Sequence, residues 1–459
     1  MNGSNLNLEE KLTEYVANVT YDDLPAEAVD YCKLLLMDTL GVAFPGSRAP
    51  GCPEITELAG MWAVDAGASV LIRGSRTTPP LAAMANSAMM HALDFDDTLD
   101  ASALHTFVTV LPAALAVAEN RGTVSGRQLI TALVLGVDLV SRISLGIRRP
   151  LSWIRTATCG AFGAAAAAAK LMELDRTGIA NALGVVYSQV CGNAQGLIEG
   201  RLVKRLQPGF AASAGVLSAF LAQRGITGSG QFLCGSYGYY NLYERGVFEP
   251  EPVLADLGVR PAILDLSIKP YPSCRMTHAS IDAALAIQKR IGTASDAIER
   301  VEISASKMVA EMVGKPFVIG SNPQVDAQFS IPYTVSCALV RGDVFLGDFE
   351  SGAINDSRLL DLAGRVNVAE NPDLPDNDLF HAHVVVRCSD GTAHESGVEV
   401  PLGNPAKAMN AEKCKEKFRK CVAYSGIEIS DQRLKDLLVM IENLEEIRDV
   451  VELIGLMRV

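Results

Sequence analysis

The stretch "TATCGAFGAAAAAAKLMEL" (residues 156–174) decides the fold class, because it consists almost wholly of small residues. Alanine has the highest intrinsic helix propensity, so the stretch is expected to be helical. Glycine and alanine at close spacing also let the backbones of neighbouring helices approach one another. The stretch therefore predicts a domain built from tightly packed helices.

Helical patterning extends outward from this stretch over most of residues 8–265. One helix is predicted to begin near Pro25 and to end near Gly41, and another is predicted to begin after Ser125, a plausible N-cap. After about residue 265 the pattern changes, and β-branched residues alternate or cluster. This change marks a second kind of domain.

Strands are predicted at "AIERVEISAS" (297–306) and at "HAHVVVRCSDGTAHESGVEVPLG" (381–403), where a DG turn suggests a hairpin. The predicted fold class is mainly α with a smaller α+β domain. It has a large all-helical domain over residues 1–268 and a lid-like α+β domain over 269–405. C-terminal helices over 406–459 are expected to return to the helical domain, which would make that domain discontinuous in sequence.

Composition narrows the partners that the chain is expected to have. The 459 residues carry a formal net charge of −13 and no clustered Lys/Arg block, which argues against nucleic acid and anionic membranes as partners. We expect no apolar run as long as the roughly 20 residues that are needed to span a bilayer. The ten cysteines form no C-x-x-C pair, which is typical of reduced thiols. With a polar, acidic N-terminus, these features predict a cytoplasmic protein.

Charge is concentrated in "HALDFDDTLDASALH" (91–105), directly after an apolar helix. His91, Asp94 and Asp97 are spaced i, i+3 and i+6, so they would share one face if the helix continued. The acids could simply be solvated or could cap the next helix. The spacing also resembles a metal set, but one imidazole and two carboxylates on one segment are a weak signal, and we expect no metal.

Other cationic and titratable side chains stand among apolar or small residues, next to prolines and glycines at helix entries. Such positions suit carboxylate binding, although ordinary capping and surface charge explain them equally well. They are Lys204 and Arg205 in "EGRLVKRLQPGFAA" (199–212), and Lys269, Arg275 and His278 in "SIKPYPSCRMTHASIDAAL" (267–285).

Eight stretches resemble, in order along the chain, the motifs of one family. They are "DLPAEAVDYCKLLLMDTLGVAFPG" (23–46), "HALDFDDT" (91–98), "VLPAALAVAE" (110–119), the alanine-rich stretch (156–174), "KRLQPGFAASAGVLSAFLAQRGITG" (204–228), "KPYPSCRMTHASIDAAL" (269–285), "DAQFSIPYTVSCAL" (326–339) and "GNPAKAMNAEKCKEKF" (403–418). This is the MmgE/PrpD family, which includes 2-methylcitrate dehydratase, cis-aconitate decarboxylase and iminodisuccinate epimerase.

The resemblance implies a helical domain with a smaller α+β domain, usually as a homodimer, and no required cofactor. It implies a small-molecule di- or tricarboxylate substrate, from which a proton next to a carboxylate is removed or to which one is returned. Matching the motifs position by position implies five catalytic residues: Asp94, His105, Lys204, Lys269 and His278. The residues expected to bind substrate are Arg155, Arg275, Asp97 and Gln207.

The chain departs from the family's pattern where the family has histidines. Leu99, Ile154 and Gln207 stand at three such positions, and Arg155 has appeared beside one of them. His105 is the best candidate for the proton-transfer group, because the unperturbed pKa of histidine is near neutrality. Asp94 would orient it or act as its partner.

Three classes of function stay open on these residues. The first is a hydro-lyase similar to 2-methylcitrate dehydratase, in which His105 works with Asp94 or Lys204. The second is an epimerase, with Lys269 or His278 opposite His105, or an enzyme similar to cis-aconitate decarboxylase. The third is a catalytically silent member of the family that only binds polycarboxylates.

Overall fold

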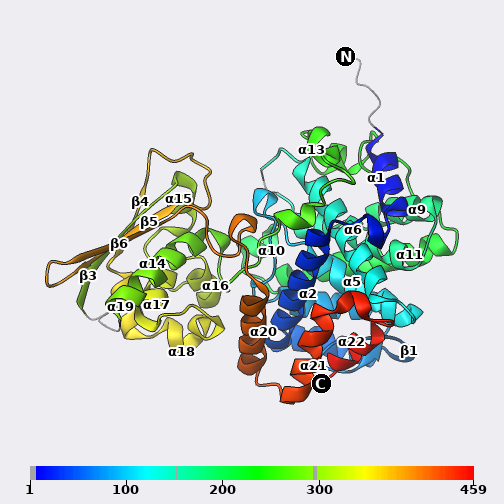
Figure 1. Cartoon of the computed structure of the whole chain (residues 1–459). Coiled ribbons are helices and arrows are strands. Elements are labelled where there is room, and N and C mark those ends of the chain that lie inside the picture. The colour runs from blue at the N-terminus through cyan, green and yellow to red at the C-terminus, as the bar shows by residue number, and fades with distance from the viewer. Residues whose placement is uncertain (1–6, 151, 293–296) are drawn as a thin grey trace. The chain divides into compact units, whose positions relative to one another are not determined.

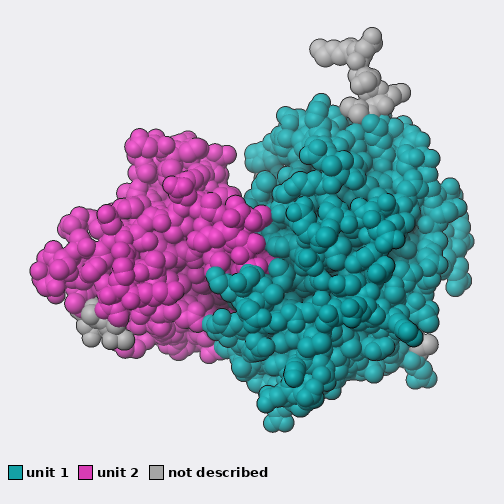
Figure 2. Space-filling view, in the orientation of Figure 1, with its two compact units in different colours: residues 1–267, 410–459 teal, residues 268–409 magenta. Residues whose placement is uncertain are grey.

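The computed structural model describes residues 7–150, 152–292 and 297–459 of the chain (Figure 1). The chain divides into two compact units, which Figure 2 shows in different colours. Unit 1 combines residues 1–267 with residues 410–459, and unit 2 comprises residues 268–409. Unit 1 is thus formed by two separate stretches of the chain.

Unit 1 is mainly helical, and it also holds the short strands β1 (Ala63–Ser69) and β2 (Arg76–Thr77). Its helices are α1 (Leu8–Asn18), α2 (Ala26–Gly46), α3 (Cys52–Met61), α4 (Pro79–His91), α5 (Phe107–Arg121), α6 (Gly126–Leu145), α7 (Arg155–Thr158), α8 (Gly160–Leu171), α9 (Arg176–Tyr187), α10 (Gln195–Ile198), α11 (Val203–Gln223), α12 (Tyr239–Leu242), α13 (Glu251–Leu254), α20 (Ala411–Ser425), α21 (Asp431–Glu442) and α22 (Val451–Leu456).

The alanine-rich helix α8 lies at the centre of unit 1 and packs against α5, α6, α9 and α11. Gly163 of α8 meets Gly136 of α6 so closely that a Cβ on Gly163 would lie 2.6 Å from the carbonyl oxygen of Gly136. A Cβ on Gly215 of α11 would lie 2.5 Å from the Cβ of Ala164. These helices pack backbone against backbone, and the predicted fold class, mainly α with a smaller α+β domain, is confirmed.

Two details of the helical prediction are wrong. Helix α2 does not end near Gly41 but continues to Gly46. Gly41 is needed for packing, because a Cβ there would lie 3.0 Å from the ring of Phe418 on α20. Unit 1 is also not all-helical, since β1 and β2 form an antiparallel pair in which Ser69 faces Arg76.

Helix α6 corrects the prediction that no segment is long and apolar enough to span a membrane. By length and composition alone, Gly126–Leu145 meets that requirement. However, 89% of its most apolar window is buried inside the protein, as expected for the core helix of a domain. Its N-terminus has a capping box, in which Ser125 and Gln128 each bind the other's backbone N–H.

The C-terminal helices belong to unit 1, where α20 packs along α2 (Figure 1). Phe418 of α20 contacts Phe44 of α2 edge to face, with ring centroids 5.8 Å apart. Helix α21 also contacts α2, and α22 contacts α5. A segment from the end of the chain therefore completes the packing of a helix near its beginning.

Unit 2 is a four-stranded sheet with helices on one face. The strand order is β4-β3-β5-β6, in which β3 pairs parallel with β4 and antiparallel with β5. Its elements are β3 (Ile298–Ala305), β4 (Val366–Glu370), β5 (Ala382–Cys388), β6 (Ala393–Val398), α14 (His278–Ile291), α15 (Lys307–Val313), α16 (Pro323–Gln328), α17 (Ile331–Arg341), α18 (Ser351–Ile354) and α19 (Ser357–Ala363).

The predicted hairpin is present as β5 and β6, in which Val384 faces Ser396. Buried and more exposed residues alternate along β5, so only one face of the sheet enters the core. Helices α14 and α17 cover that face. The predicted strand at 297–306 corresponds to β3.

Candidate active site

The charged stretch after α4 is a loop, residues 92–106, that joins α4 to α5. Helix α4 is apolar and buried, and it ends at His91. Asp94 has a positive φ of 54°, a left-handed conformation that non-glycine residues seldom adopt and that aspartate tolerates better than most. The helix therefore does not continue, and the condition under which His91, Asp94 and Asp97 would share one helical face is not met.

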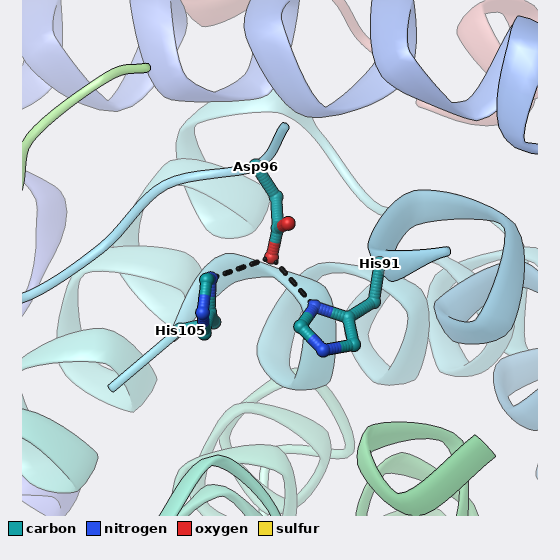
Figure 3. A group of neighbouring side chains, drawn as sticks. All are labelled: His91, Asp96 and His105. Atoms are coloured by element: carbon teal, nitrogen blue, oxygen red, sulfur yellow. Dashed lines mark hydrogen bonds and ion pairs between the residues drawn. The ribbon is translucent and has the colours of Figure 1, made fainter. Parts of the chain in front are cut away.

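Two histidines converge on one carboxylate in this loop (Figure 3). The Nδ1 atom of His91 lies 2.9 Å from Oδ2 of Asp96, and Nδ1 of His105 lies 2.9 Å from the same oxygen. The two rings meet edge to face, with centroids 4.8 Å apart. Asp96 is completely buried, whereas 15% of the side chain of His105 is exposed. The side chain of His91 is only 2% exposed, so His105 is the more accessible of the two imidazoles.

Lys204 and Asp94 close these three side chains into a ring. The Nζ atom of Lys204, in the first turn of α11, lies 3.1 Å from Nε2 of His91 and 3.5 Å from Oδ1 of Asp94. The same Oδ1 lies 3.9 Å from Nε2 of His105. The structure thus brings together three of the predicted catalytic residues. We call these three, with His91 and Asp96, the five-residue ring.

The electrostatics of the ring follow from its burial. Burial would raise the pKa of Asp96, but the neighbouring imidazoles of His105 and His91 hold that pKa well below its usual range. Burial, reinforced by the ammonium of Lys204, lowers the pKa of His91 to about 4. At neutral pH His91 is therefore uncharged and Asp96 is ionised.

The depressed pKa of His91 predicts a pH-dependent stability. The pKa is about 4 in the folded protein against an ordinary 6.5, so below pH 6.5 the unfolded chain binds a proton that the folded protein does not. The contribution of neutral His91 to the free energy of unfolding is therefore complete above pH 6.5. It is lost as the pH falls to 4, and the total loss is up to about 3 kcal/mol. Urea unfolding at several pH values should show this loss, and His91→Gln should flatten it. Equal slopes for both proteins would contradict it.

His91, Asp96 and His105 also have the composition of a metal site, and one ligand atom from each lies within 4.8 Å of the others. The 2.9 Å separations between Oδ2 of Asp96 and the two Nδ1 atoms are hydrogen-bonding distances. The ammonium of Lys204 lies against the remaining nitrogen of His91, where it would repel a cation. These contacts fit a proton-transfer cluster better than a metal site.

Asp97 was predicted to bind substrate, and the structure corrects this. Its carboxylate accepts hydrogen bonds from the backbone N–H and hydroxyl of Thr106 and from the backbone N–H of Phe107. Burial, followed by the charge of Asp96, raises the pKa of Asp97. Asp97 is wholly buried and caps the N-terminus of α5, so it holds the loop in place.

The backbone next to His105 is fixed by helix α7. The backbone N–H of His105 donates to Oγ1 of Thr156 at 3.1 Å, and Arg155 donates to the carbonyl oxygen of Ser102 at 3.3 Å. The guanidinium of Arg155 also donates to the carbonyl oxygen of Arg149 at 2.6 Å. Arg155 therefore supports the loop that carries His105, and its role in binding substrate stays a prediction.

A buried ion pair lies behind the ring. Nζ of Lys417, on α20, lies 2.6 Å from Oδ1 of Asp38 on α2, and both side chains are buried. Nζ of Lys417 also donates to the backbone oxygen of Phe95 at 2.8 Å and lies 3.7 Å from the centre of the phenyl ring of Phe95. Burial raises the pKa of Asp38 to about 6, against the opposing effect of Lys417. The residue directly before Asp96 is thus held by the C-terminal part of unit 1.

Gln207 was also predicted to bind substrate, and the structure gives it another role. Its amide oxygen accepts from the backbone N–H of Asn193 at 2.7 Å, and its amide nitrogen donates to the carbonyl oxygen of Asn193 at 3.0 Å. Both ends of the amide are therefore engaged with one backbone residue. Gln207 ties the segment before α10 to helix α11.

Lys269, Arg275 and His278 belong to unit 2 and are all buried. Nδ1 of His278 lies 3.0 Å from Nη1 of Arg275, and Nε2 of His278 lies 3.3 Å from the carbonyl oxygen of Ser273. His278 is completely buried and both of its ring nitrogens are engaged, so in this arrangement it contacts Arg275, and its catalytic role stays a prediction. The predicted roles of Lys269 and Arg275 stay predictions.

Sequence reasoning missed His91 and Asp96 as members of the site. Matching the family's motif selected Asp94, the helical spacing singled out Asp94 and Asp97, and neither pointed to Asp96. Once the helix ends, adjacent acids can point in opposite directions, as Asp96 and Asp97 do. The end of α4 at His91 was the signal that could have found them, because it leaves two adjacent acids in a loop between two histidines.

Comparison with known families identifies the family of this chain. The MmgE/PrpD N-terminal domain matches residues 10–251, and the MmgE/PrpD C-terminal domain matches residues 271–443. The chain belongs to the MmgE/PrpD family. The resemblance inferred from the eight motifs is therefore confirmed.

Named members of the MmgE/PrpD family align over nearly the whole chain. A cis-aconitate decarboxylase of Aspergillus terreus is 28% identical, over 97% of this chain and 95% of that protein. The human cis-aconitate decarboxylase is 26% identical, over 93% of this chain and 89% of that protein. The 2-methylcitrate dehydratase of Escherichia coli K12 is 23% identical, over 95% and 94% respectively.

Proposed function

We propose that this chain is a lyase that moves a proton at a carbon next to a carboxylate of a tricarboxylic acid, with His105 as the proton-transfer group. That the chain is an enzyme of the lyase type follows from its family and from its relatives, which are decarboxylases and dehydratases. The carrying observation is the contact of 2.9 Å between Nδ1 of His105 and Oδ2 of Asp96.

This contact prepares His105 for proton transfer. An ionised Asp96 at Nδ1 favours the tautomer with hydrogen on Nδ1, which leaves the lone pair on Nε2. It also stabilises the imidazolium once Nε2 has taken a proton. Nε2 lies toward Asp94, on the part-exposed side of the ring, so a substrate can be reached there.

Lys204 supplies a positive charge beside this imidazole. A lysine in the first turn of a helix opposes the helix dipole, which disfavours it by about 0.3–1 kcal/mol. The N-terminus of a 21-residue helix and an ammonium together attract an anion. A position that is unfavourable for folding is thus suited to binding a substrate carboxylate, and to stabilising the negative charge that develops in the transition state.

Decarboxylation of cis-aconitate is the first candidate reaction. It needs one proton donor, since carbon dioxide leaves from one carbon as a proton is added at the far end of the double bond. His105 in its protonated form supplies this proton from Nε2. The decarboxylases among the relatives, at 26–28% identity, are also more similar to this chain than the dehydratases, at 22–24%.

Dehydration of a 2-methylcitrate-like acid is the second candidate, favoured by the side chains around His105. Elimination of water needs a base for the proton and an acid for the leaving hydroxyl group. His105 and Lys204 lie on either side of Asp94 and could divide these tasks. The candidates differ in what leaves the substrate, so one experiment separates them.

The test is to incubate the purified chain with cis-aconitate and with 2-methylcitrate in heavy water, and to analyse the products by mass spectrometry and NMR. Loss of carbon dioxide from cis-aconitate, with one deuterium incorporated, is the expected result. Loss of water from 2-methylcitrate would favour the second candidate. Deuterium exchange without any loss would indicate an epimerase, and no change in any di- or tricarboxylate would contradict the lyase proposal.

Asp96→Asn tests the role of the shared carboxylate. An asparagine amide cannot stabilise the imidazolium of His105 and no longer favours hydrogen on both Nδ1 atoms. We expect kcat to fall by about 10²-fold or more, with a smaller effect on KM. Asp97→Asn is the matched neighbour: it alters the cap of α5 and should lower thermal stability more than it lowers kcat. Equal losses of kcat in both variants would contradict the role given to Asp96.

A further inference from the structure

His91 has no access to substrate in this arrangement, yet both of its ring nitrogens contact members of the five-residue ring. The side chain is 2% exposed. Nδ1 lies 2.9 Å from Oδ2 of Asp96, and Nε2 lies 3.1 Å from Nζ of Lys204. An ammonium can only donate, so Nε2 must present its lone pair and the ring proton must sit on Nδ1. The neighbours of His91 thereby define a single tautomer.

The contact with Lys204 restricts a flexible side chain. A lysine ammonium is a point charge on a four-carbon stem, and its position depends on the acceptors around it. Nζ is held here between Nε2 of His91 and Oδ1 of Asp94. Without His91, the acceptor on the buried side is lost, and the ammonium is free to move toward Asp94 and solvent.

The contact with Asp96 affects the other imidazole. Oδ2 of Asp96 lies equally close to Nδ1 of His91 and to Nδ1 of His105. A donor from His91 takes up part of the charge on that oxygen. If the donor from His91 is removed, the carboxylate of Asp96 interacts with His105 alone, and this favours the charged imidazolium form of His105.

The charged and titratable groups around the two imidazoles come from four elements. Residues of loop 92–106 and of α11 contact the two imidazoles or interact electrostatically with them, and a charged pair from α2 and α20 interacts electrostatically with Asp96 and Asp97. They are Asp94, Asp96 and Asp97 of the loop, Lys204 of α11, Asp38 of α2 and Lys417 of α20.

We propose that His91 is a positioning residue that fixes the ammonium of Lys204 and divides the charge of Asp96 between two imidazoles. Through these two contacts it sets where the substrate carboxylate is held and at what pH His105 gains its proton. The proposal rests on the proposed function, in which His105 and Lys204 touch the substrate.

Two substitutions separate the two contacts. In His91→Asn, the amide nitrogen can take the place of Nδ1 and keep the donor to Asp96, but the side chain is too short to reach Lys204. In His91→Gln, the amide oxygen can take the place of Nε2 and keep the acceptor for Lys204, but the donor to Asp96 is lost. Each variant therefore tests one contact and serves as the control for the other.

The kinetic expectations differ for the two variants. His91→Asn should raise KM for the tricarboxylate about tenfold and leave the pH profile in place. His91→Gln should leave KM nearly unchanged and move the limb of the kcat/KM profile that reports His105 to higher pH by about one unit; this is the alkaline limb where His105 donates a proton, as in decarboxylation, and the acid limb where it accepts one. A purely structural role would instead lower the melting temperature of both variants without separating KM from the pH profile, and that result would overturn the proposal.

A measurement without turnover keeps this proposal separable from the proposed function. NMR of the full chain labelled with 15N-histidine should show His91 as the neutral tautomer protonated on Nδ1 between pH 5 and about 8. The titration midpoint of His105 should rise in His91→Gln and stay in place in His91→Asn. If these signals behave as expected but no polycarboxylate turns over, the function fails and the positioning role stands. If turnover is present and neither KM nor the midpoint changes, the positioning role fails.

Discussion

Replacing His105 with alanine should lower kcat by about 10²–10⁴-fold on the tricarboxylate substrate, while KM changes little. The reason is that Nδ1 of His105 contacts the buried carboxylate of Asp96, while the side chain of His105 is itself partly exposed. Alanine removes the atom that carries the proton but leaves Lys204, which binds the substrate. Steady-state kinetics with both candidate substrates measure the effect.

The control for His105→Ala is His383→Ala, a change at an exposed histidine on β5 of unit 2. It removes the same kind of side chain and should leave kcat and KM near the values of the unchanged protein. Melting curves followed by circular dichroism show whether both variants are folded. If His105→Ala keeps more than about a tenth of the rate, His105 is not the proton-transfer group.

Replacing Lys417 with methionine should lower the free energy of unfolding by about 3–5 kcal/mol. Methionine preserves much of the packing of the side chain but removes the charge that compensates the buried carboxylate of Asp38. It also removes the donor to the carbonyl oxygen of Phe95, next to Asp96. Activity should fall as well, because the loop that carries the shared carboxylate loses a support.

The matched control is Lys413→Met, which lies one turn earlier on the same helix and is exposed. Exposed charges contribute little to stability, so this variant should unfold within about 1 kcal/mol of the unchanged protein. Urea unfolding of the three proteins gives the comparison. Similar midpoints for Lys417→Met and Lys413→Met would show that the buried ion pair does not stabilise unit 1.

The helical fold could be predicted because local composition and packing agree. The small residues around Gly163 favour a helix and also allow the close contact with Gly136 that the structure contains. Gly41 shows the limit of such reasoning. Its sequence signal is a helix end, but Phe418, far along the chain, decides that the helix continues past it.

Site residues could be predicted where a single residue stands out in the sequence. They could not be predicted where membership of the site depends on the direction of a side chain. Lys204 stands out as a charge in apolar surroundings, the family's motif implies His105, and the structure places both in the ring. Asp96 and Asp97 are adjacent and chemically identical in the sequence. Only the turn at Asp94, with its positive φ, directs one to the histidines and the other to the N-terminus of α5.

The contact of Lys417 with Phe95 joins residues 322 positions apart in the chain. During synthesis, the loop that carries His105 and the shared carboxylate of Asp96 leaves the ribosome long before Lys417, which holds it. The loop therefore gains the support of Lys417 only after the last stretch of unit 1 has folded back onto α2. A nascent chain that pauses within unit 2 would contain all five members of the ring and still lack this support.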